Sequence, residues 1–302
     1  MPDARGHLTT ERANPASEAL EQLPALAGVE LMIREDESIH SAVHAARTEI
    51  AAAVELVARR LASGGRLIYV GAGTSGRLAA LDAAECPPTF STEPDLVQAA
   101  LAGGPQAMLS AIEGAEDSEP AGCQEMDTRA VGPADVVFGI TAGGTTPYVH
   151  GALAEARRRG AATVFFACVP RQAVPDSADV SIRVVTGPEV LAGSTRLKAG
   201  TATKMVLNMV STLCMARLGK IHGNLMVDVN TRGNRKLVDR GERLVESIAS
   251  VSRERAGEFL EQAGGEVKVA IVMASCGCNA SRARARLTDA GGVLRRALEN
   301  RE

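Results

Sequence analysis

Short apolar runs alternate with longer stretches of helical periodicity through most of this chain of 302 residues. Each run is too short for a buried helix, and its length is typical of a fully buried strand. Strand–helix alternation at this spacing predicts an α/β fold, a doubly wound and mostly parallel sheet flanked by helices. The expected strands cover residues 67–70, 96–101, 135–140, 163–167 and 180–185.

Helical patterns fill the segments between and beyond these strands. The helix after the first strand is expected to stop near Ala84, because Pro87-Pro88 follow and the residue before a proline disfavours helical backbone. Residues 267–273 fit either a strand or a helix, since their β-branched side chains lie among helical neighbours. Other helices are expected over 38–62, 147–159, 196–218, 237–250, 253–262 and 281–299.

These patterns divide the chain into three parts. Residues 1–56 form an N-terminal arm and helices, 57–220 form the α/β domain, and 221–302 form a small helical C-terminal region. The first 16 residues are polar and contain prolines and a glycine, so we expect them to be a flexible arm.

Composition excludes several classes of function. Lys and Arg total 33 against 36 Asp and Glu, and this net charge of −3 argues against a nucleic-acid binder, which needs a basic face. No apolar run approaches the ~18 residues of a membrane span, and the N-terminus lacks the apolar segment of a secretory signal. We therefore expect a cytoplasmic protein with neither a nucleic-acid nor a membrane partner.

The cysteines and histidines do not suggest a metal site. None of the six cysteines forms a CxxC pair, and no spacing of Cys and His resembles a zinc site. His40 and His44 share a helix face, but the chain lacks an HExxH motif. We expect no metal and no cofactor.

A glycine-rich turn follows the first strand. Gly71-Ala-Gly73-Thr-Ser-Gly76 matches G-x-G-x-x-G between a strand and a helix, where backbone N–H groups can hold an anion. A dinucleotide would also need an acidic residue after the next strand, and that strand ends in Leu101-Ala-Gly-Gly-Pro105. The hydroxyls of Thr74 and Ser75 suit a terminal phosphate. A phosphomonoester site is therefore favoured over a dinucleotide site, and a purely structural turn remains open.

Two more hydroxyl-rich loops follow later strands. Residues 141–147 read Thr-Ala-Gly-Gly-Thr-Thr-Pro, and Gly193-Ser-Thr-Arg-Leu-Lys198 precedes the long helix. Loops at the carboxyl ends of strands are where open α/β sheets bind ligands, although helix capping alone would explain Ser194 or Thr195. The candidate phosphate-binding residues of the three loops are Gly73, Thr74, Ser75, Gly76, Thr141, Gly144, Thr145, Thr146, Ser194 and Lys198.

Several longer segments resemble one enzyme family. Glu85-Cys-Pro-Pro and Gly-Ala-Glu116-Asp are the most specific of them. The chain resembles the N-acetylmuramic acid 6-phosphate etherases, members of the sugar-isomerase (SIS) domain superfamily, over nearly its whole length. The segments that carry the resemblance are 67–77, 81–90, 113–117, 193–201 and 223–229.

The resemblance implies a SIS-type fold with residues 57–220 as the sugar-phosphate-binding domain. It also implies a homodimer and a lyase that converts N-acetylmuramic acid 6-phosphate to N-acetylglucosamine 6-phosphate and D-lactate, in cell-wall sugar catabolism and peptidoglycan recycling. Glu85 and Glu116 match the two catalytic glutamates of the family. Many relatives have Ser-Gly-x-Thr-Pro in the second loop, where this chain has Gly143, so one phosphate-binding hydroxyl is missing.

The expected positions of the glutamates suggest separate roles. Glu85 is expected at a helix end, where the partial negative charge disfavours a carboxylate and suits a proton donor. Glu116 precedes a plausible helix start, where partial positive charge favours the ionised form and suits a base. Two other functions remain possible on this fold, a non-catalytic sugar-phosphate sensor and a sugar-phosphate isomerase.

Overall fold

The protein is described here by a computed structural model covering residues 5–229, 231 and 235–299. Contacts group these residues into two compact units. Unit 1 contains the residues up to 83 and residues 95–211, and unit 2 contains 84–94 and the residues from 212 onward. The division falls within two helices, α3 (Gly73–Phe90) and α6 (Lys198–Arg217). The predicted three-part division at residues 56 and 220 stays a prediction.

Unit 1 is built on a five-stranded sheet in which every pair of neighbouring strands is parallel. The strand order is β2-β1-β3-β4-β5, so the chain reverses its direction of winding between β1 and β3. This arrangement confirms the predicted doubly wound, parallel α/β fold. The strands are β1 (Leu67–Gly71), β2 (Val97–Leu101), β3 (Val136–Ile140), β4 (Ala162–Ala167) and β5 (Val180–Arg183).

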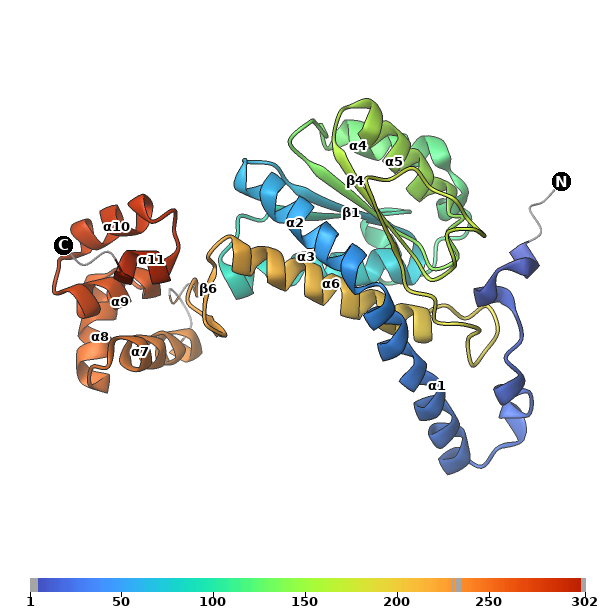
Figure 1. The fold of residues 1–302 in the computed structure, drawn as a ribbon, viewed down its shortest axis with the longest axis horizontal. Coiled ribbons are helices and arrows are strands. Elements are labelled where there is room, and N and C mark those ends of the chain that lie inside the picture. Colours follow the sequence, from blue (N-terminus) through green and yellow to red (C-terminus); the bar gives the residue numbers. More distant parts are fainter. Residues whose placement is uncertain (1–4, 230, 232–234, 300–302) are drawn as a thin grey trace. The chain divides into compact units, whose positions relative to one another are not determined.

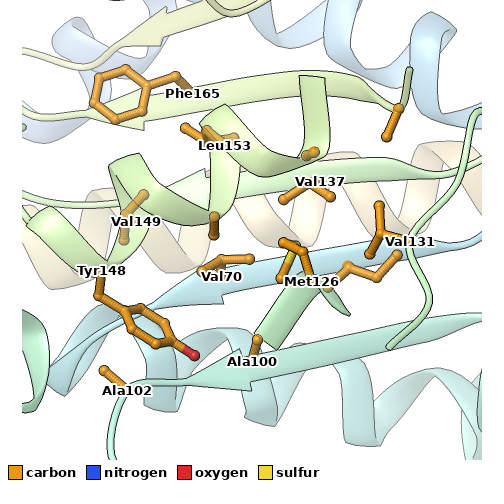
Figure 2. Close-up of a cluster of buried hydrophobic side chains, with 14 of the residues drawn as sticks. Val70, Ala100, Ala102, Met126, Val131, Val137, Tyr148, Val149, Leu153 and Phe165 are labelled. Carbon is orange, nitrogen blue, oxygen red and sulfur yellow. The ribbon is translucent and has the colours of Figure 1, made fainter. Parts of the chain in front are cut away.

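Helices cover both faces of this sheet (Figure 1). On one face α4 (Glu119–Thr128) and α5 (Pro147–Arg158) pack on alternate residues of the central strands, and Figure 2 shows Val70, Val137 and Phe165 beneath α5. On the other face, the Tyr69 hydroxyl donates a hydrogen bond to Asp82 of α3 at 3.2 Å. Burial on both faces explains why the strands are short, unbroken apolar runs.

Two of the helices predicted for the first part of the chain have the wrong boundaries. The pattern over 38–62 belongs to two helices, α1 (Ala25–Ala45) and α2 (Arg47–Ala62). Helix α3 continues through Pro87 and Pro88 to Phe90 instead of stopping near Ala84. A proline removes one helical N–H, but the next turn still closes, with the Ser91 N–H donating to the Pro87 carbonyl at 2.9 Å.

From Arg5 onward the N-terminal segment is folded as part of unit 1, contrary to the expectation of a flexible arm over residues 1–16, of which 1–4 lie outside the described residues. Short 3₁₀ turns occupy Arg5–His7, Thr9–Glu11, Pro15–Ser17 and Leu20–Gln22. Leu8 is 1% exposed and packs in the core cluster of the sheet, and Thr10 is fully buried. A single leucine among polar residues gives no periodic signal, which is why sequence patterning missed this contact.

Unit 2 contains the predicted small helical C-terminal region. A short hairpin, β6 (Ile221–His222) and β7 (Leu225–Met226), precedes five helices around a separate apolar core. Residues 267–273 lie in a helix, and the pattern over 281–299 is divided at Gly291 and Gly292, both of which have positive φ. The helices are α7 (Arg235–Ala249), α8 (Arg253–Gln262), α9 (Val267–Cys276), α10 (Ala280–Asp289) and α11 (Leu294–Glu299). No helix among the described residues is long and apolar enough to cross a membrane.

Candidate active site

A cavity of about 240 Å³ lies in unit 1 and is lined by residues after β1 and β3. Those two strands flank the point where the winding of the sheet reverses, which is where open α/β sheets bind their ligands. The cavity is lined by Leu8, Glu11, Ala72, Gly73, Thr74, Ser75, Glu116, Ile140, Thr141, Ala142, Gly143, Thr145, Thr146 and Thr195.

The first loop brings the start of α3 to the cavity. Gly73 begins the helix with φ +52°, and, apart from its chain neighbours and the backbone of its own helix, no atom of the described residues lies within 4 Å of the position that a Cβ would take there. The first backbone N–H groups of a helix have no partner within it and carry partial positive charge. Gly76 does not line the cavity; it packs so closely on its neighbours that a Cβ there would lie 2.6 Å from the Gly71 carbonyl oxygen.

The second loop presents three threonines, Thr141, Thr145 and Thr146, to the cavity. The Thr141 hydroxyl accepts a hydrogen bond from the Gly144 N–H at 3.1 Å and lies 2.9 Å from the Thr146 hydroxyl. Gly144 has φ +83° and is buried, so it shapes the turn without lining the cavity. The hydroxyl groups of Thr141, Thr145 and Thr146 can donate hydrogen bonds to a ligand or accept them from it.

The third loop contributes less than its sequence predicts. Thr195 lines the cavity, but neither Ser194 nor Lys198 does. At the start of α6, the Glu189 carboxylate accepts hydrogen bonds from the N–H groups of Lys198 and Ala199, at 2.8 and 2.9 Å. Burial raises the pKa of this carboxyl, and the two N–H donors only partly offset that effect. The chain's own carboxylate thus takes the place that a ligand anion would take at this helix.

The Lys198 ammonium is also occupied by the chain itself. It is 3% exposed and forms an ion pair with Glu35 of α1 at 2.9 Å. Asn14 donates a second hydrogen bond to the same carboxylate oxygen at 2.7 Å. Burial tends to raise the pKa of Glu35, but the bonds from Lys198 and Asn14 outweigh it and hold the pKa below its usual value. This network fastens the N-terminal segment and α1 to the start of α6.

Glu116 lies on the wall of the cavity. It belongs to a 3₁₀ turn, Ala115–Asp117, that begins after Gly114 in the left-handed region and leads into α4. Ser118 caps α4 as the sequence suggests, accepting a hydrogen bond from the Ala121 N–H at 3.2 Å. The Glu116 side chain is half-buried and open to the cavity that the glycine loop forms.

Glu85 belongs to unit 2 and is exposed on α3. It stands more than a helical turn before Phe90, because α3 continues past the two prolines. The charge of a helix end falls off within the last turn. Glu85 therefore lies outside the reach of the charge at this helix end, and its assignment as proton donor depends on the family resemblance alone.

The N-terminal segment supplies wall residues that sequence patterning missed. Leu8 and Glu11 line the cavity although they lie more than 60 residues before the first of its other lining residues, Ala72. No local signal could have found them, because their place depends on tertiary contacts with loops more than a hundred residues away.

The charges of the cavity are unusual for an anion site. Among its described lining residues the ionisable side chains are Glu11 and Glu116, with no lysine, arginine or histidine. A bound phosphate would therefore depend on the N–H groups of α3 and on hydroxyls rather than on ion pairs. Within the described part of the chain, no group of three His, Cys, Asp or Glu side chains could hold a metal ion.

Comparison with known proteins identifies full-length relatives. The chain is 52% identical over 297 residues to an N-acetylmuramic acid 6-phosphate etherase of Synechocystis sp., covering 98% of this chain and 97% of the relative. It is 54% identical to a protein of the same name from Gloeobacter violaceus, covering 98% and 96%. A third, from Gloeothece citriformis, is 50% identical and covers 99% and 97%.

Two family models match parts of the chain. The SIS domain matches residues 113–213, and the N-terminal SIS domain of glucokinase regulatory protein matches residues 49–157. Together the two matches span the five strands and the three loops that line the cavity, so the similarity includes the region where most of the site residues lie.

Proposed function

Since the chain belongs to the N-acetylmuramic acid 6-phosphate etherase family, we propose that the unit 1 cavity is part of its active site. The protein is a carbon–oxygen lyase that cleaves the lactyl ether of N-acetylmuramic acid 6-phosphate, giving D-lactate and N-acetylglucosamine 6-phosphate. A sugar-phosphate sensor and an isomerase are not favoured, because relatives that match over nearly the full length are named etherases.

One observation carries the proposal for the site. A half-buried glutamate, Glu116, shares a single cavity with the start of α3 and with the threonines of the second loop. The helix start and the hydroxyls suit a phosphomonoester, while a carboxylate in the same cavity suits proton transfer. Binding a phosphate alone would require no carboxylate, which would repel the dianion.

The chemistry needs one base and one acid. In the open-chain sugar, the C1 aldehyde acidifies the proton on C2. A base removes that proton, a C2–C3 double bond forms as the C3–O bond breaks, and an acid protonates the departing lactyl oxygen. Water then adds its oxygen to C3 and a proton returns to C2. Neither step requires a metal or a nicotinamide.

We assign the base to Glu116 and the proton donor to Glu85. Glu116 fits the base because it lines the cavity beside the expected phosphate site. Glu85 fits the donor by its place in the Glu85-Cys-Pro-Pro segment that resembles the family. After lactate departs, the Glu85 carboxylate is free to activate the water. Each group, when well placed, contributes a factor of about 10²–10⁴ to the rate.

The proposal is tested by D-lactate release from the purified protein. We expect lactate from N-acetylmuramic acid 6-phosphate and none from the unphosphorylated sugar, because the phosphate supplies the binding contacts of the first two loops. Equal release from both sugars would contradict a phosphate site in the cavity. No release from either, with the protein folded, would refute the activity itself.

Gly143 offers a test of the second loop. A Cβ at Gly143 would lie 3.7 Å from the Thr10 hydroxyl and 3.8 Å from Leu8, which is ordinary van der Waals contact. Among the described residues, the buried Thr10 hydroxyl has no hydrogen-bond partner. We therefore expect Gly143→Ser to fold normally and to lower the KM for the phosphorylated sugar about 2–10-fold, the value of one added neutral hydrogen bond.

Gly143→Ala is the matched control for this variant, since it fills the same space without a hydroxyl. Its KM should stay at or above that of the wild type. A serine variant no better than the alanine variant would show that position 143 does not reach the ligand.

We further propose that the chain forms a homodimer. Helix α1 displays Leu26, Val29, Met32 and Ile33 on its surface, with exposures of 71, 54, 38 and 58%. Four neighbouring apolar side chains on one helix face support a role in association with another protein surface, and the family resemblance makes a second copy the expected partner.

We also propose a cytoplasmic enzyme that acts in peptidoglycan recycling, with residues 57–220 as its sugar-phosphate-binding domain. A phosphorylated sugar is a dianion and does not cross a lipid bilayer unaided, so the enzyme must share a compartment with the reaction that phosphorylates its substrate. The muramic acid skeleton of that substrate supports an origin in cell-wall sugars.

A further inference from the structure

We propose that Glu11 is a further substrate-binding residue of this enzyme, whose carboxylate accepts a hydrogen bond from a hydroxyl group of the sugar. This inference rests on the proposed function of the unit 1 cavity. It assigns a role to the N-terminal segment, whose residues Leu8 and Glu11 line that cavity.

Both ends of the N-terminal segment are held firmly in place. Leu8 is 1% exposed in the core cluster that includes Val149 and Val169. The Thr10 carbonyl accepts a hydrogen bond from the Gly193 N–H of the third loop at 3.1 Å. Further along, the Ser17 hydroxyl donates to the Val190 carbonyl at 2.7 Å. A side chain placed between these anchors has a defined position rather than that of a loose terminus.

Glu11 is the member of this segment whose polar group is available to a ligand. Its side chain lines the cavity and is solvent-exposed, whereas Leu8 and Thr10 are buried. One carboxylate oxygen lies against the third loop, 3.2 Å from the position that a Cβ on Gly193 would take. Gly193 has φ +74° and no side chain, which leaves room for the carboxylate beside the loop.

Charge decides which part of the substrate Glu11 can contact. The phosphate and the lactyl carboxylate are anions and would be repelled by a carboxylate. An ionised carboxylate only accepts hydrogen bonds, so its partner must be a donor. The sugar offers hydroxyl groups, and a hydroxyl bonded to a carboxylate is held more strongly than one bonded to a neutral oxygen. Glu11 would thereby select for the sugar while the first two loops select for the phosphate.

Glu11→Ala tests this role by binding measurements with two ligands. N-acetylglucosamine 6-phosphate fills both the sugar and the phosphate subsites, whereas inorganic phosphate fills only the second. We expect the variant to bind the sugar phosphate about 10–100-fold more weakly, as for the loss of one charge-assisted hydrogen bond, and to bind inorganic phosphate as well as the wild type or better. Glu11→Gln keeps an acceptor oxygen without the charge, so its affinity for the sugar phosphate should fall between those of the wild type and Glu11→Ala.

Glu18→Ala is the matched control, because Glu18 is exposed in the same N-terminal region and does not line the cavity. It should leave both affinities unchanged. If Glu11→Ala weakens both ligands alike, Glu11 only supports the fold of the loops, and if it weakens neither, Glu11 does not touch the ligand. Either result overturns the proposal.

The binding assay does not depend on turnover. A wild-type protein that binds N-acetylglucosamine 6-phosphate but releases no lactate would refute the proposed reaction, and the comparison of the two ligands would still decide the role of Glu11. A change confined to the sugar phosphate is a result that a purely structural role would not produce.

Discussion

Glutamine in place of Glu116 should lower kcat for lactate release by about 10²–10⁴-fold, equivalent to roughly 3–5 kcal/mol of transition-state stabilisation. Glutamine has the size of glutamate but cannot accept the C2 proton. Glu116 lies on the cavity wall in the middle of a short 3₁₀ turn, and its side chain is not the cap of α4, so we expect the substitution to leave the turn and that cap intact. Kinetics of D-lactate release from N-acetylmuramic acid 6-phosphate measure the effect.

Exchange of the C2 proton with deuterated solvent isolates the step that Glu116 performs. With the base removed, exchange should be lost together with lactate release, while affinity for N-acetylglucosamine 6-phosphate stays close to that of the wild type. Glu113→Gln is the control, since Glu113 is exposed three residues away and does not line the cavity. Continued exchange in Glu116→Gln would assign the base to another residue.

Glu85→Gln should produce a loss of lactate release of similar size, about 10²–10⁴-fold, with a different signature. Glutamine cannot donate a proton to the lactyl oxygen, so the C3–O bond no longer breaks at a useful rate. The base remains, and we expect solvent exchange at C2 to continue. Because Glu85 is exposed on α3, the neutral substitution should leave the thermal stability within the range typical of surface changes, about ±0.5 kcal/mol.

Glu93→Gln provides the comparison for Glu85→Gln. Glu93 is an exposed glutamate in the same short segment of unit 2, just after α3, and it has no proposed role. Its replacement should leave kcat unchanged. If Glu85→Gln abolished exchange at C2 while Glu116→Gln spared it, the two roles would be reversed, and if Glu85→Gln retained full activity, the proton donor would lie elsewhere.

Much of the fold is predictable because its signals are local. Short apolar runs such as 136–140 match buried strands, since both faces of a parallel sheet are covered. The glycines of the first loop are likewise local requirements: a Cβ on Gly71 would lie 2.7 Å from the Gly76 nitrogen. The ends of helices are harder to predict from sequence. In α3, Pro87 and Pro88 lack the backbone N–H that donates a helical hydrogen bond, yet the helix continues to Phe90.

In the candidate site too, the residues that could be recognised from sequence are those with a local signal. Thr74, Ser75, Thr141, Thr145 and Thr146 could be recognised because each follows a strand at the edge where parallel strands end together. Ser194 and Lys198 fit the same pattern, yet they lie outside the cavity. The reason is a partner that no pattern reveals, since Glu189 fills the start of α6 and Glu35 neutralises the Lys198 ammonium.

The order of residues along the chain therefore specifies the strands, the glycine turns and the family segments around Glu85 and Glu116, because those depend on neighbours in sequence. Tertiary structure alone places Leu8 and Glu11 on the wall of the cavity and withdraws Lys198 from it. Such contacts join residues more than a hundred positions apart. Their formation depends on the packing and charge balance of the folded chain, and periodicity carries no information about either.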